Sequence, residues 1–533
     1  MNEAAKKDMA DGNTGRVAAG SSSELLWPVA GEPAEARAPW GALLALMALA
    51  TVLRSIALNQ QLWYDEITTL LDFVRMPMAH IVTTYTSQNQ HMLYSVLARV
   101  AVVTFGDAAW TLRLPALLFG VLTVPALYFC ARLLTTRRES LLACALLAVS
   151  YHHVWFSQNA RGYTGLAFFT LVATYFFMRG AQEKSRAGLK AAPTNAATWR
   201  MWVGYAIALA LGMYTHLTMG FIAAGHGTVY LWLLAARSRA LGRLPRNAWA
   251  PVVGFVLAGV ITAALYAPVM GDMIQRTVGA AATASPTGQA VQSEWKSPLW
   301  LILETARGLG AGSAVIGIMA MSIGGLVVLA GLWSFFRENR YAVGLMIFPG
   351  LVTAAAMLVL SRNLWPRFFF FAIGFGLMLI VRGAMEWAAA ASRLLKRETQ
   401  GSAWGTAVVA ALLLGSCVQL RAAYLYPKQD YLGAMSYVDA KQKPGDAVAL
   451  VGLTTIPYQK YYGRNWPGVE SPAQLEALRR SGQSTWVLYT IPIHVASRYP
   501  ELWNTLQREC AQPKVFRGTM GGGEVYVCRV EGK

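Results

Sequence analysis

The chain has few charged residues for its length. Only 14% of its 533 residues are Asp, Glu, Lys or Arg, whereas 55% are hydrophobic. An ordinary soluble domain carries about 25% charged residues, so this composition excludes that class. Apolar runs of about twenty residues, each long enough to cross a bilayer, recur along the chain. The sequence therefore predicts an α-helical polytopic membrane protein.

Acidic residues are scarcer than basic ones. The chain has 27 Asp and Glu against 46 Lys and Arg, which gives a formal net charge of +19. Such an excess can indicate nucleic-acid binding, but here the basic residues stand in short clusters between apolar runs. That pattern is typical of cytoplasmic loops and of contact with anionic lipids. We therefore expect membrane lipids, and no nucleic acid, among the partners.

Cysteine is also rare, with five residues. Cys130, Cys144 and Cys417 fall in apolar runs, where cysteine packs as a small hydrophobic residue. Cys510 and Cys528 both fall in the less apolar C-terminal part. Their pairing as a disulfide in an oxidising compartment is one alternative, and two free thiols are the other.

The start of the chain has no short apolar core followed by a small-residue cleavage site. Residues 1–38 are rich in Ala, Gly, Ser and charge and lack apolar periodicity, which predicts a disordered cytoplasmic tail. The first apolar run, 39–58, is full-length, so we expect a retained transmembrane helix. Basic residues precede this helix and place the N-terminus inside.

Ten further apolar runs are long enough, or nearly so, to span a bilayer. They lie near 110–134, 140–157, 163–179, 201–215, 217–236, 250–270, 311–336, 341–361, 366–390 and 403–422. With the first run they predict about 11 transmembrane helices. Alternation from an inside N-terminus then places every large basic cluster, including Arg337/Arg340 and Arg393/Lys396/Arg397, on the cytoplasmic side, as the positive-inside rule requires.

This agreement requires that the segment 59–108 does not cross the membrane. The apolar stretch 92–105 is then an amphipathic helix on the outer surface, within a long first external loop. Residues 271–298 form a second long external loop, which is polar and contains glycine. The transmembrane domain is expected at 39–423.

Hydropathy falls after about residue 424. The remaining residues, 424–533, are predicted to form a small C-terminal α/β domain outside the membrane. Strands are expected near 447–453, 485–491, 514–518 and 524–530, and helices near 431–441, 472–481 and 499–509.

Two adjacent carboxylates, Asp65 and Glu66, follow the first predicted span. Ionisable groups at a membrane face are functional candidates, although an acidic pair after a transmembrane helix is often only a solvated loop. The topology brings further polar residues to the same external face: His91, Arg113, Arg161, Tyr163, His216 and Arg367. Arg54, in the outer half of the first span, can reach the same face by snorkelling. Proton-accepting carboxylates beside guanidinium groups indicate chemistry on a lipid-linked phosphorylated substrate.

Several short motifs follow one another in order. They are Trp63-Tyr64-Asp65-Glu66, His91-Met92-Leu93-Tyr94, Phe105-Gly106, Leu112-Arg113-Leu114-Pro115, Ser157-Gln158-Asn159-Ala160-Arg161-Gly162-Tyr163 and Tyr214-Thr215-His216. This succession, within residues 40–390, resembles the GT-C superfamily of polyprenyl-phosphate-sugar glycosyltransferases. Within that superfamily it is similar to the bacterial branch of protein O-mannosyltransferases and lipid A aminoarabinose transferases.

The resemblance implies a GT-C type fold and a membrane-embedded, inverting transferase. Its donor is a sugar on a polyprenyl phosphate, and an acidic residue of the first external loop acts on the hydroxyl of a glycan, lipid or protein acceptor. The location implied is a bacterial inner membrane, with the C-terminal domain in the periplasm. The family's first-loop prolines are absent from Gln90-His91-Met92-Leu93-Tyr94. Metal-dependent relatives carry acidic residues where this chain has Gln158-Asn159, so we expect neither a metal nor another cofactor.

The chemistry suggests a role for each candidate. Asp65 is expected to be the general base, with Glu66 sharing this role or orienting the acceptor. The leaving phosphate already carries charge and needs cations, for which Arg161 and Arg367 lead and Arg113 and Arg54 follow.

Each assignment has a structural alternative. Arg161 and Arg113 would instead pair with carboxylates or cap helices, and Arg367 would anchor at the interface. His91, Tyr163 and His216 are candidate substrate contacts, with hydrogen bonding and the aromatic belt as their alternatives.

Two other functions fit part of the pattern. A transporter or flippase of lipid-linked sugars also has many spans, but such proteins more often show mid-span charges and paired broken helices in two repeated halves. A membrane scaffold whose external domain binds a partner is the second, and it leaves Asp65 and Glu66 without a role. The glycosyltransferase accounts for more of the residues.

Overall fold

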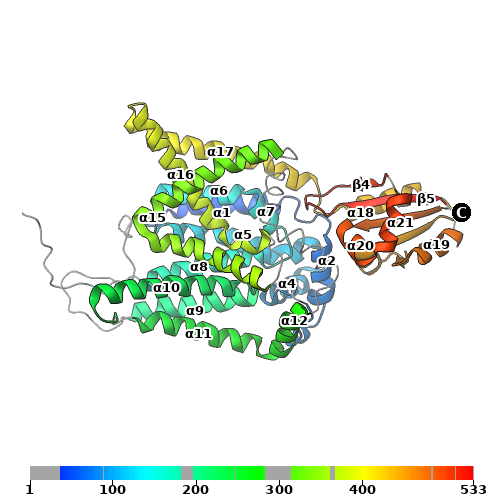
Figure 1. Cartoon of the computed structure of the whole chain (residues 1–533), viewed down its shortest axis with the longest axis horizontal. Helices are drawn as coiled ribbons and strands as arrows, with labels where there is room; N and C mark the ends of the chain where they lie inside the picture. Colours follow the sequence, from blue (N-terminus) through cyan, green and yellow to red (C-terminus); the bar gives the residue numbers. More distant parts are fainter. Residues whose placement is uncertain are drawn as a thin grey trace, which may run out of the picture.

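The computed structural model describes residues 37–87, 89–181, 196–245, 248–282, 314–360, 366–481, 484–510 and 512–531. A helical bundle lies beside a smaller C-terminal domain that contains a sheet (Figure 1). The predicted tail as far as residue 36, and the part of the predicted second loop from residue 283 to 298, lie outside the described residues.

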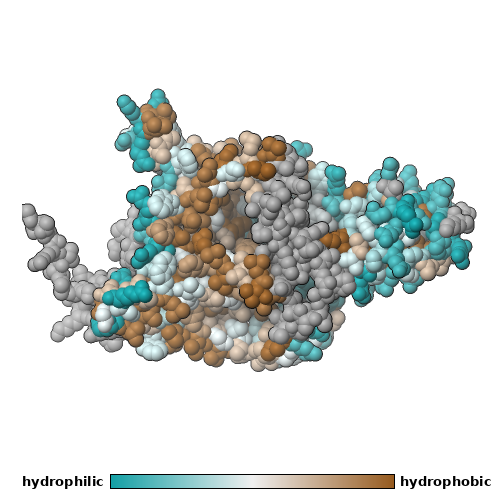
Figure 2. Space-filling view, viewed as in Figure 1, coloured by the Kyte–Doolittle hydropathy of each residue, from teal (hydrophilic) through white to brown (hydrophobic). Residues whose placement is uncertain are grey.

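Apolar helices build the bundle, because an apolar run within lipid satisfies its own backbone hydrogen bonds only as a helix. They are α1 (Trp40–Ser55), α5 (Ala109–Ala131), α6 (Arg137–Val149), α7 (Tyr151–Ser157), α8 (Tyr163–Ala181), α9 (Ala196–Thr215), α10 (Met219–Leu241), α11 (Trp249–Tyr266), α15 (Ala314–Val359), α16 (Ile373–Leu394) and α17 (Gly401–Leu425). A brown apolar surface covers these helices, and teal polar surface covers the C-terminal domain and the opposite tips (Figure 2).

Seven helices among the described residues are long and apolar enough to cross a membrane. The number is eight if the pair α6 and α7, bent by 58°, is one broken span. The bend falls at Ser150, whose extended backbone ends α6 and whose side chain accepts the first hydrogen bond of α7 from the His153 N–H. The chain is therefore a multi-pass membrane protein, while the predicted number of eleven spans is not confirmed by this count.

Helix α15 covers two of the predicted spans. Its 46 residues would extend about 69 Å, more than twice the thickness of a hydrocarbon core. Asn339, with φ −155° and ψ 91°, interrupts the helical backbone between the predicted runs 311–336 and 341–361. Asn339 Oδ1 accepts hydrogen bonds from the N–H groups of Tyr341 and Ala342, which caps the second half.

Shorter elements gather at the end of the bundle that faces the C-terminal domain (Figure 1). They are α2 (Tyr64–Thr69), η2 (Leu70–Val74), α3 (Met78–Thr83), α4 (Met92–Phe105), η3 (Ala267–Val269), α12 (Met270–Ala282) and η4 (Pro366–Ala372). The 14 residues of α4 extend about 21 Å, which is shorter than a bilayer core of about 30 Å. Helix α1, with 16 residues, is also shorter than this core, so the prediction that the stretch 92–105 does not cross stays a prediction.

The C-terminal domain has one five-stranded sheet in the order β2-β1-β3-β5-β4. β1 pairs in parallel with β2 and β3, and β5 pairs antiparallel with β3 and β4. The strands are β1 (Ala447–Val451), β2 (Gly468–Val469), β3 (Ser484–Thr490), β4 (Lys514–Phe516) and β5 (Val525–Glu531). The helices of this domain are α18 (Tyr431–Lys441), η6 (Gly452–Thr454), η7 (Ile456–Tyr461), α19 (Pro472–Ser481), α20 (Pro492–Arg498) and α21 (Pro500–Glu509). One further short helix, η5 (Glu398–Gln400), precedes α17 in the bundle.

The predicted elements of this domain are found close to their expected positions, with small differences at several ends; β4, for example, ends at Phe516 and not at residue 518. The strand predicted to reach residue 453 ends at Val451, because Gly452, at φ 64°, turns the chain into η6. β2 has only two residues, too few for a sequence pattern. α20 follows β3 directly and starts at Pro492, so the strand predicted as far as residue 491 stops at Thr490.

The C-terminal domain is packed onto the bundle through one shared apolar cluster. Leu62 and Ile67 of the first loop are buried together with Tyr431, Val448 and Tyr458 of the domain. Polar contacts surround this cluster. The Gln61 amide donates to Asp430 Oδ1 at 2.8 Å, and the Trp155 indole N–H donates to Thr519 Oγ1 at 2.9 Å. The loop that carries Asp65 and Glu66 is thus held between the bundle and the domain.

The disulfide between Cys510 and Cys528 joins the end of α21 to β5 and closes a separation of 18 residues. The sequence left open whether these two cysteines are paired or free, and the structure shows them paired. Both cysteines are buried in the apolar cluster on one face of the sheet, with Leu502 and Leu506 beside them. Changing both cysteines to serine should destabilise the domain by about 2–4 kcal/mol, because the unfolded chain regains the freedom of a closed loop.

Thermal unfolding of the purified protein, followed with and without reductant, measures this effect. The serine variant should unfold at lower temperature than wild type, and reductant should lower the wild-type transition to the same point. Changing Cys417, a free and exposed cysteine, to serine is the matched control and should leave the transition in place. An unchanged transition in the double variant would contradict the assigned role.

Candidate active site

Glu66 and Arg113 form a fully buried ion pair beneath the first loop. The Arg113 guanidinium donates from Nε to Glu66 Oε1 at 2.7 Å and from Nη2 to Oε2 at 2.6 Å. The two side chains are 0% and 1% exposed. Such bidentate geometry is the strong form of carboxylate–guanidinium contact. The pair connects α2 with α5 at the level of the membrane boundary.

The remaining hydrogen-bonding capacity of the pair is also used. Arg113 donates to the carbonyl oxygens of Leu58, Gln60 and Gln61, at 2.7 to 3.1 Å. Glu66 Oε1 also accepts from the Ala160 N–H at 2.8 Å. A buried ion pair is tolerated only when its other donors and acceptors are satisfied in this way. The ion pair therefore connects three segments through hydrogen bonds: the turn after α1, the start of α2 and the loop after α7.

Burial alone would raise the pKa of Glu66, but the neighbouring Arg113 guanidinium and Lys428 ammonium outweigh it and hold that pKa below its usual range. Glu66 is therefore ionised at neutral pH. Lys428, from the segment between α17 and α18, donates to the Gln158 carbonyl oxygen at 2.6 Å. Burial and the Arg113 charge lower the pKa of Lys428 to about 7, while Glu66 opposes this shift.

Lys428 and its neighbour Gln429 were not among the site residues predicted from the sequence. The Tyr64 N–H donates to Gln429 Oε1 at 2.9 Å, so the C-terminal segment supports the first turn of α2. These residues stand more than 360 positions from Tyr64 in the chain. A lysine shortly after an apolar helix gives no signal of such a contact, because basic residues commonly end transmembrane helices.

Asp65 lies on a different side of α2 from Glu66 and faces two guanidinium groups. Its Oδ2 is 3.6 Å from Arg161 Nη1 and 3.8 Å from Arg367 Nη1. The Asp65 and Arg161 side chains are 15% and 3% exposed, whereas Arg367 is 33% exposed. These distances are longer than hydrogen bonds, so the three groups attract one another without being locked together.

The Arg161 guanidinium has N–H groups that no described residue accepts a hydrogen bond from. Its Nη2 donates to Asn89 Oδ1 at 3.2 Å, but its buried Nε and Nη1 donate no hydrogen bond within the described residues. A buried guanidinium with unsatisfied donors is costly unless a ligand accepts from it. Arg161 therefore fits a phosphate or another anion next to Asp65.

His91, Tyr163 and His216 form a ring cluster beside Arg161. The His91 ring centroid lies 4.7 Å from that of His216 and 5.5 Å from that of Tyr163. Burial lowers the pKa of His216 to about 3, and the Arg161 and Arg367 charges add to this shift. Burial, and then Arg161, likewise lower the pKa of His91 well below its usual value. Both rings are neutral at pH 7, so they add no positive charge to the site.

Arg54 points away from this cluster. Its guanidinium is 0% exposed and donates to Ser157 Oγ and to the carbonyl oxygens of Ala50, Leu147 and Ala148. The structure thus brings Asp65, Arg161 and Arg367 together, with the rings beside them. Arg113 and Arg54 are instead held in interior contacts.

A groove of about 610 Å³ leads away from Arg367. Phe156 and Phe370 line it beside Arg367, and Ile373, Leu377 and Ile380 of α16 continue it along the bundle. Its lining thus combines the Arg367 guanidinium with mostly apolar side chains. Such a lining suits a molecule with a charged head and a long apolar chain.

No cluster of three or more His, Cys, Asp or Glu that could hold a metal ion occurs within the described ranges. The expectation that the protein works without a metal or another cofactor stays a prediction.

Comparison with known proteins supports the predicted class. Residues 89–269, about a third of the chain, match the family described as dolichyl-phosphate-mannose-protein mannosyltransferase. No curated protein matches the sequence.

Some solved structures are similar to this chain at low sequence identity. AglB, the oligosaccharyltransferase of Archaeoglobus fulgidus, is similar with a TM-score of 0.51 and 12% identity, over 91% of this chain and 74% of that one. ArnT from Cupriavidus metallidurans gives a TM-score of 0.48 and 15% identity, over 92% of this chain and 98% of that one. The Pmt1-Pmt2 complex of S. cerevisiae gives 0.37 and 16%, over 47% of this chain and 36% of that one.

The family match covers the part of the chain that supplies Arg113, Arg161 and the ring cluster, and the fold shared with AglB extends over most of its length. The predicted resemblance to the GT-C superfamily of polyprenyl-phosphate-sugar glycosyltransferases is thereby confirmed as a resemblance, through a family match over about a third of the chain and a shared fold.

Proposed function

We propose that this protein transfers a sugar from a polyprenyl phosphate to a hydroxyl group of a glycan, lipid or protein acceptor. The observation that carries the proposal is the position of Asp65 between Arg161 and Arg367, where Arg367 also meets the apolar groove. A proton acceptor, phosphate ligands and a site for an apolar chain are thereby joined in one place.

The donor lies with its phosphate on the two guanidinium groups and its polyprenyl chain in the groove along α16. Arg161 supplies buried Nε and Nη1 groups that donate no hydrogen bond among the residues described, and Arg367 lines the groove. Guanidinium groups bind phosphate oxygens in bidentate geometry. The solved AglB structure holds a dolichol phosphate on the same fold, which supports a lipid phosphate as the donor head group.

Asp65 is the general base of the transfer. The acceptor oxygen attacks the anomeric carbon while its proton passes to the Asp65 carboxylate, and the bond between that carbon and the phosphate oxygen breaks. The bonding electrons leave with the polyprenyl phosphate, whose added charge Arg161 and Arg367 stabilise. Attack opposite to the leaving phosphate inverts the anomeric configuration.

Donor binding prepares this base. Before the donor arrives, Asp65 and the two arginines attract one another, at 3.6 and 3.8 Å. A bound phosphate competes for the same guanidinium groups and is stabilised by them in place of the carboxylate. Asp65 is then free to accept a proton from the acceptor hydroxyl.

Glu66 and Arg113 act as positioning residues in this proposal. Their mutual ion pair leaves them no access to substrate, although the sequence placed both among the candidate catalytic and phosphate-binding groups. His91, Tyr163 and His216 form the neutral wall beside Arg161 and remain candidate contacts for the sugar.

The reaction face is the periplasmic face of a bacterial inner membrane. Helix alternation places the basic clusters at the other end of the bundle, where the positive-inside rule locates the cytoplasm. The disulfide in the domain that packs onto Asp65's loop supports this orientation, because disulfides persist in oxidising compartments.

Replacing Asp65 with Asn should lower the transfer rate by about 10²–10⁴-fold, the usual contribution of a general base. The measurement is transfer of label from a panel of polyprenyl-phosphate sugars into membrane extract by the purified protein. Asp72→Asn, in the following η2, is the matched control and should retain activity, because Asp72 forms no ion pair with the described arginines. Wild-type transfer by Asp65→Asn would overturn the proposal.

Replacing Arg161 or Arg367 with Gln should raise the donor KM by about tenfold or more, since a hydrogen bond to a charged group contributes about 1.5–3 kcal/mol. Steady-state kinetics with varied donor concentration test this. Arg75→Gln serves as the control, because Arg75 pairs with Asp107 on the exposed surface. An unchanged donor KM in both site variants would exclude these arginines as phosphate ligands.

Replacing Glu66 with Gln should destabilise the protein by about 3–5 kcal/mol, because the Arg113 charge stays buried without its partner. Thermal unfolding in detergent should therefore show a marked decrease for this variant and little change for Asp65→Asn. The double variant Glu66→Gln, Arg113→Met should recover part of the loss. Equal unfolding temperatures for the two single variants would contradict the different roles of these adjacent carboxylates.

A further inference from the structure

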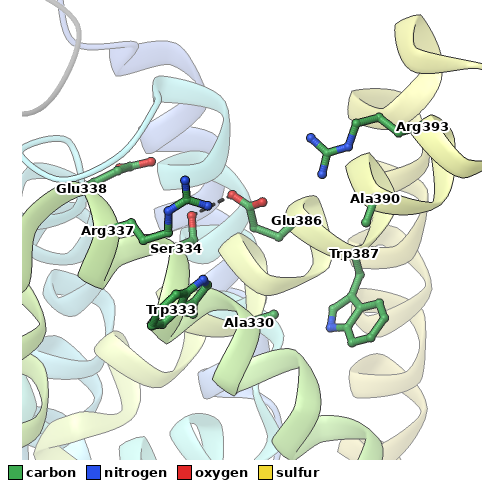
Figure 3. A pocket seen from close by; sticks show the side chains of 9 residues that line it. All are labelled: Ala330, Trp333, Ser334, Arg337, Glu338, Glu386, Trp387, Ala390 and Arg393. Atoms are coloured by element: carbon green, nitrogen blue, oxygen red, sulfur yellow. Dashed lines mark hydrogen bonds between the residues drawn. The ribbon is translucent and has the colours of Figure 1, made fainter.

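A second cavity lies between the middle of α15, just before its break at Asn339, and the last turns of α16. Its volume is about 530 Å³ (Figure 3). The lining residues on α16, from Glu386 to Arg393, belong to the last turns of that helix, whereas Arg367 of the proposed active site precedes its first turn. The cavity is therefore remote from Asp65, and the proposed transfer reaction does not use it.

Close packing of two glycines explains why the cavity forms. A Cβ on Gly331 would collide with the Leu379 carbonyl oxygen, and one on Gly383 would collide with the Val327 carbonyl oxygen. The backbones of α15 and α16 therefore touch at this level. Beyond it the helices carry larger residues and separate, and the space between them opens.

Two tryptophans flank the opening. Trp333 on α15 and Trp387 on α16 are both exposed large side chains on the lipid-facing surface. The Trp387 indole N–H donates to the Leu326 carbonyl oxygen at 3.4 Å, which holds its ring against α15. Tryptophan gathers at the head-group level of membranes, so the cavity lies where lipid head groups are found.

The lining carries two guanidinium groups and two carboxylates. Arg337 and Arg393 form no ion pair within the described residues, and Figure 3 shows both facing the same hollow as the Glu386 carboxylate. Glu386 Oε1 accepts a hydrogen bond from Ser334 Oγ at 2.7 Å. Glu338 pairs with Arg382, which also contacts Glu139 at 3.1 Å.

These charges select the kind of ligand. The two arginines of the lining can hold a phosphate, while Glu386 keeps an oxygen available for a hydrogen-bond donor. Because the Glu386 carboxylate faces the same hollow as the two arginines, a purely anionic head group would leave this negative charge without a partner. A zwitterion that carries a phosphate and a primary ammonium group matches both signs.

We propose that this cavity binds a phospholipid with a phosphoethanolamine head group. The phosphate contacts Arg337 and Arg393, the ammonium group donates to Glu386, and the acyl chains run down past Trp333 and Trp387. The site opens to the lipid-facing surface between two membrane helices, so the ligand is a bilayer lipid and not free phosphoethanolamine. Basic pockets between helices are a known location for lipid head groups.

Native mass spectrometry of the purified protein, after exchange into micelles that contain one added lipid, tests the proposal. Phosphatidylethanolamine should be retained at least about tenfold more than phosphatidylcholine, which has no N–H to donate, and more than phosphatidylglycerol, which has no ammonium group. Equal or better retention of either of these lipids would overturn the proposal. Free phosphoethanolamine at equal concentration should not displace the bound lipid, and displacement would also overturn it.

Variants test the residue assignment. The double variant Arg337→Ala, Arg393→Ala should lose retention of phosphatidylethanolamine, and Glu386→Gln should remove the preference over phosphatidylcholine while it retains phosphate binding. Lys396→Ala, Arg397→Ala removes the same charge from the same end of α16 without touching the lining, and should bind lipid as wild type does. Thermal unfolding confirms that each variant is folded. Wild-type binding by the Arg337, Arg393 variant would exclude this site.

Discussion

The buried ion pair between Glu66 and Arg113 is the interaction on which the active-site end depends. A charge pair without access to water is stable only when every remaining donor and acceptor finds a partner. Here those partners are carbonyl groups of the turn after α1, the Ala160 N–H and the nearby Lys428 charge. These segments are far apart in the chain, so their positions are set by one electrostatic requirement. Asp65 and Arg161 are adjacent to members of this network, and their separation follows from it.

The pair also separates the roles of two neighbouring carboxylates. Successive residues on a helix point in directions about 100° apart, so Asp65 and Glu66 cannot face the same ligand. Glu66 turns inward to the bundle, while Asp65 turns toward the two cations at the groove. The sequence showed two adjacent acids and gave both a catalytic role. Only the burial of Arg113 on α5 decides which of them is available to substrate.

Local hydropathy patterns predicted most of the helices and strands, but they did not predict contacts between residues far apart in the chain. The apolar runs indicated the membrane helices and the short α4, and the less apolar C-terminal part was correctly predicted to contain four of the five strands. Arg54 shows the limit: snorkelling suggested an outward guanidinium, but Ser157 and three backbone carbonyls accept its hydrogen bonds inside the bundle. Lys428 shows the same limit, because its partners belong to segments about 270 residues or more away. Such contacts depend on how helices pack.

Helix α16 relates the two lipid sites to each other. Its 22 residues extend about 33 Å, close to the thickness of a hydrocarbon core of about 30 Å. Arg367, just before α16, therefore lies in one head-group layer and Arg393, in its last turn, lies in the other. A lipid held at Arg393 and Glu386 opposes vertical displacement of the helix, since tilt and depth follow from interfacial anchors. The height of Arg367 at the donor groove is then set in part by a contact at the opposite membrane surface.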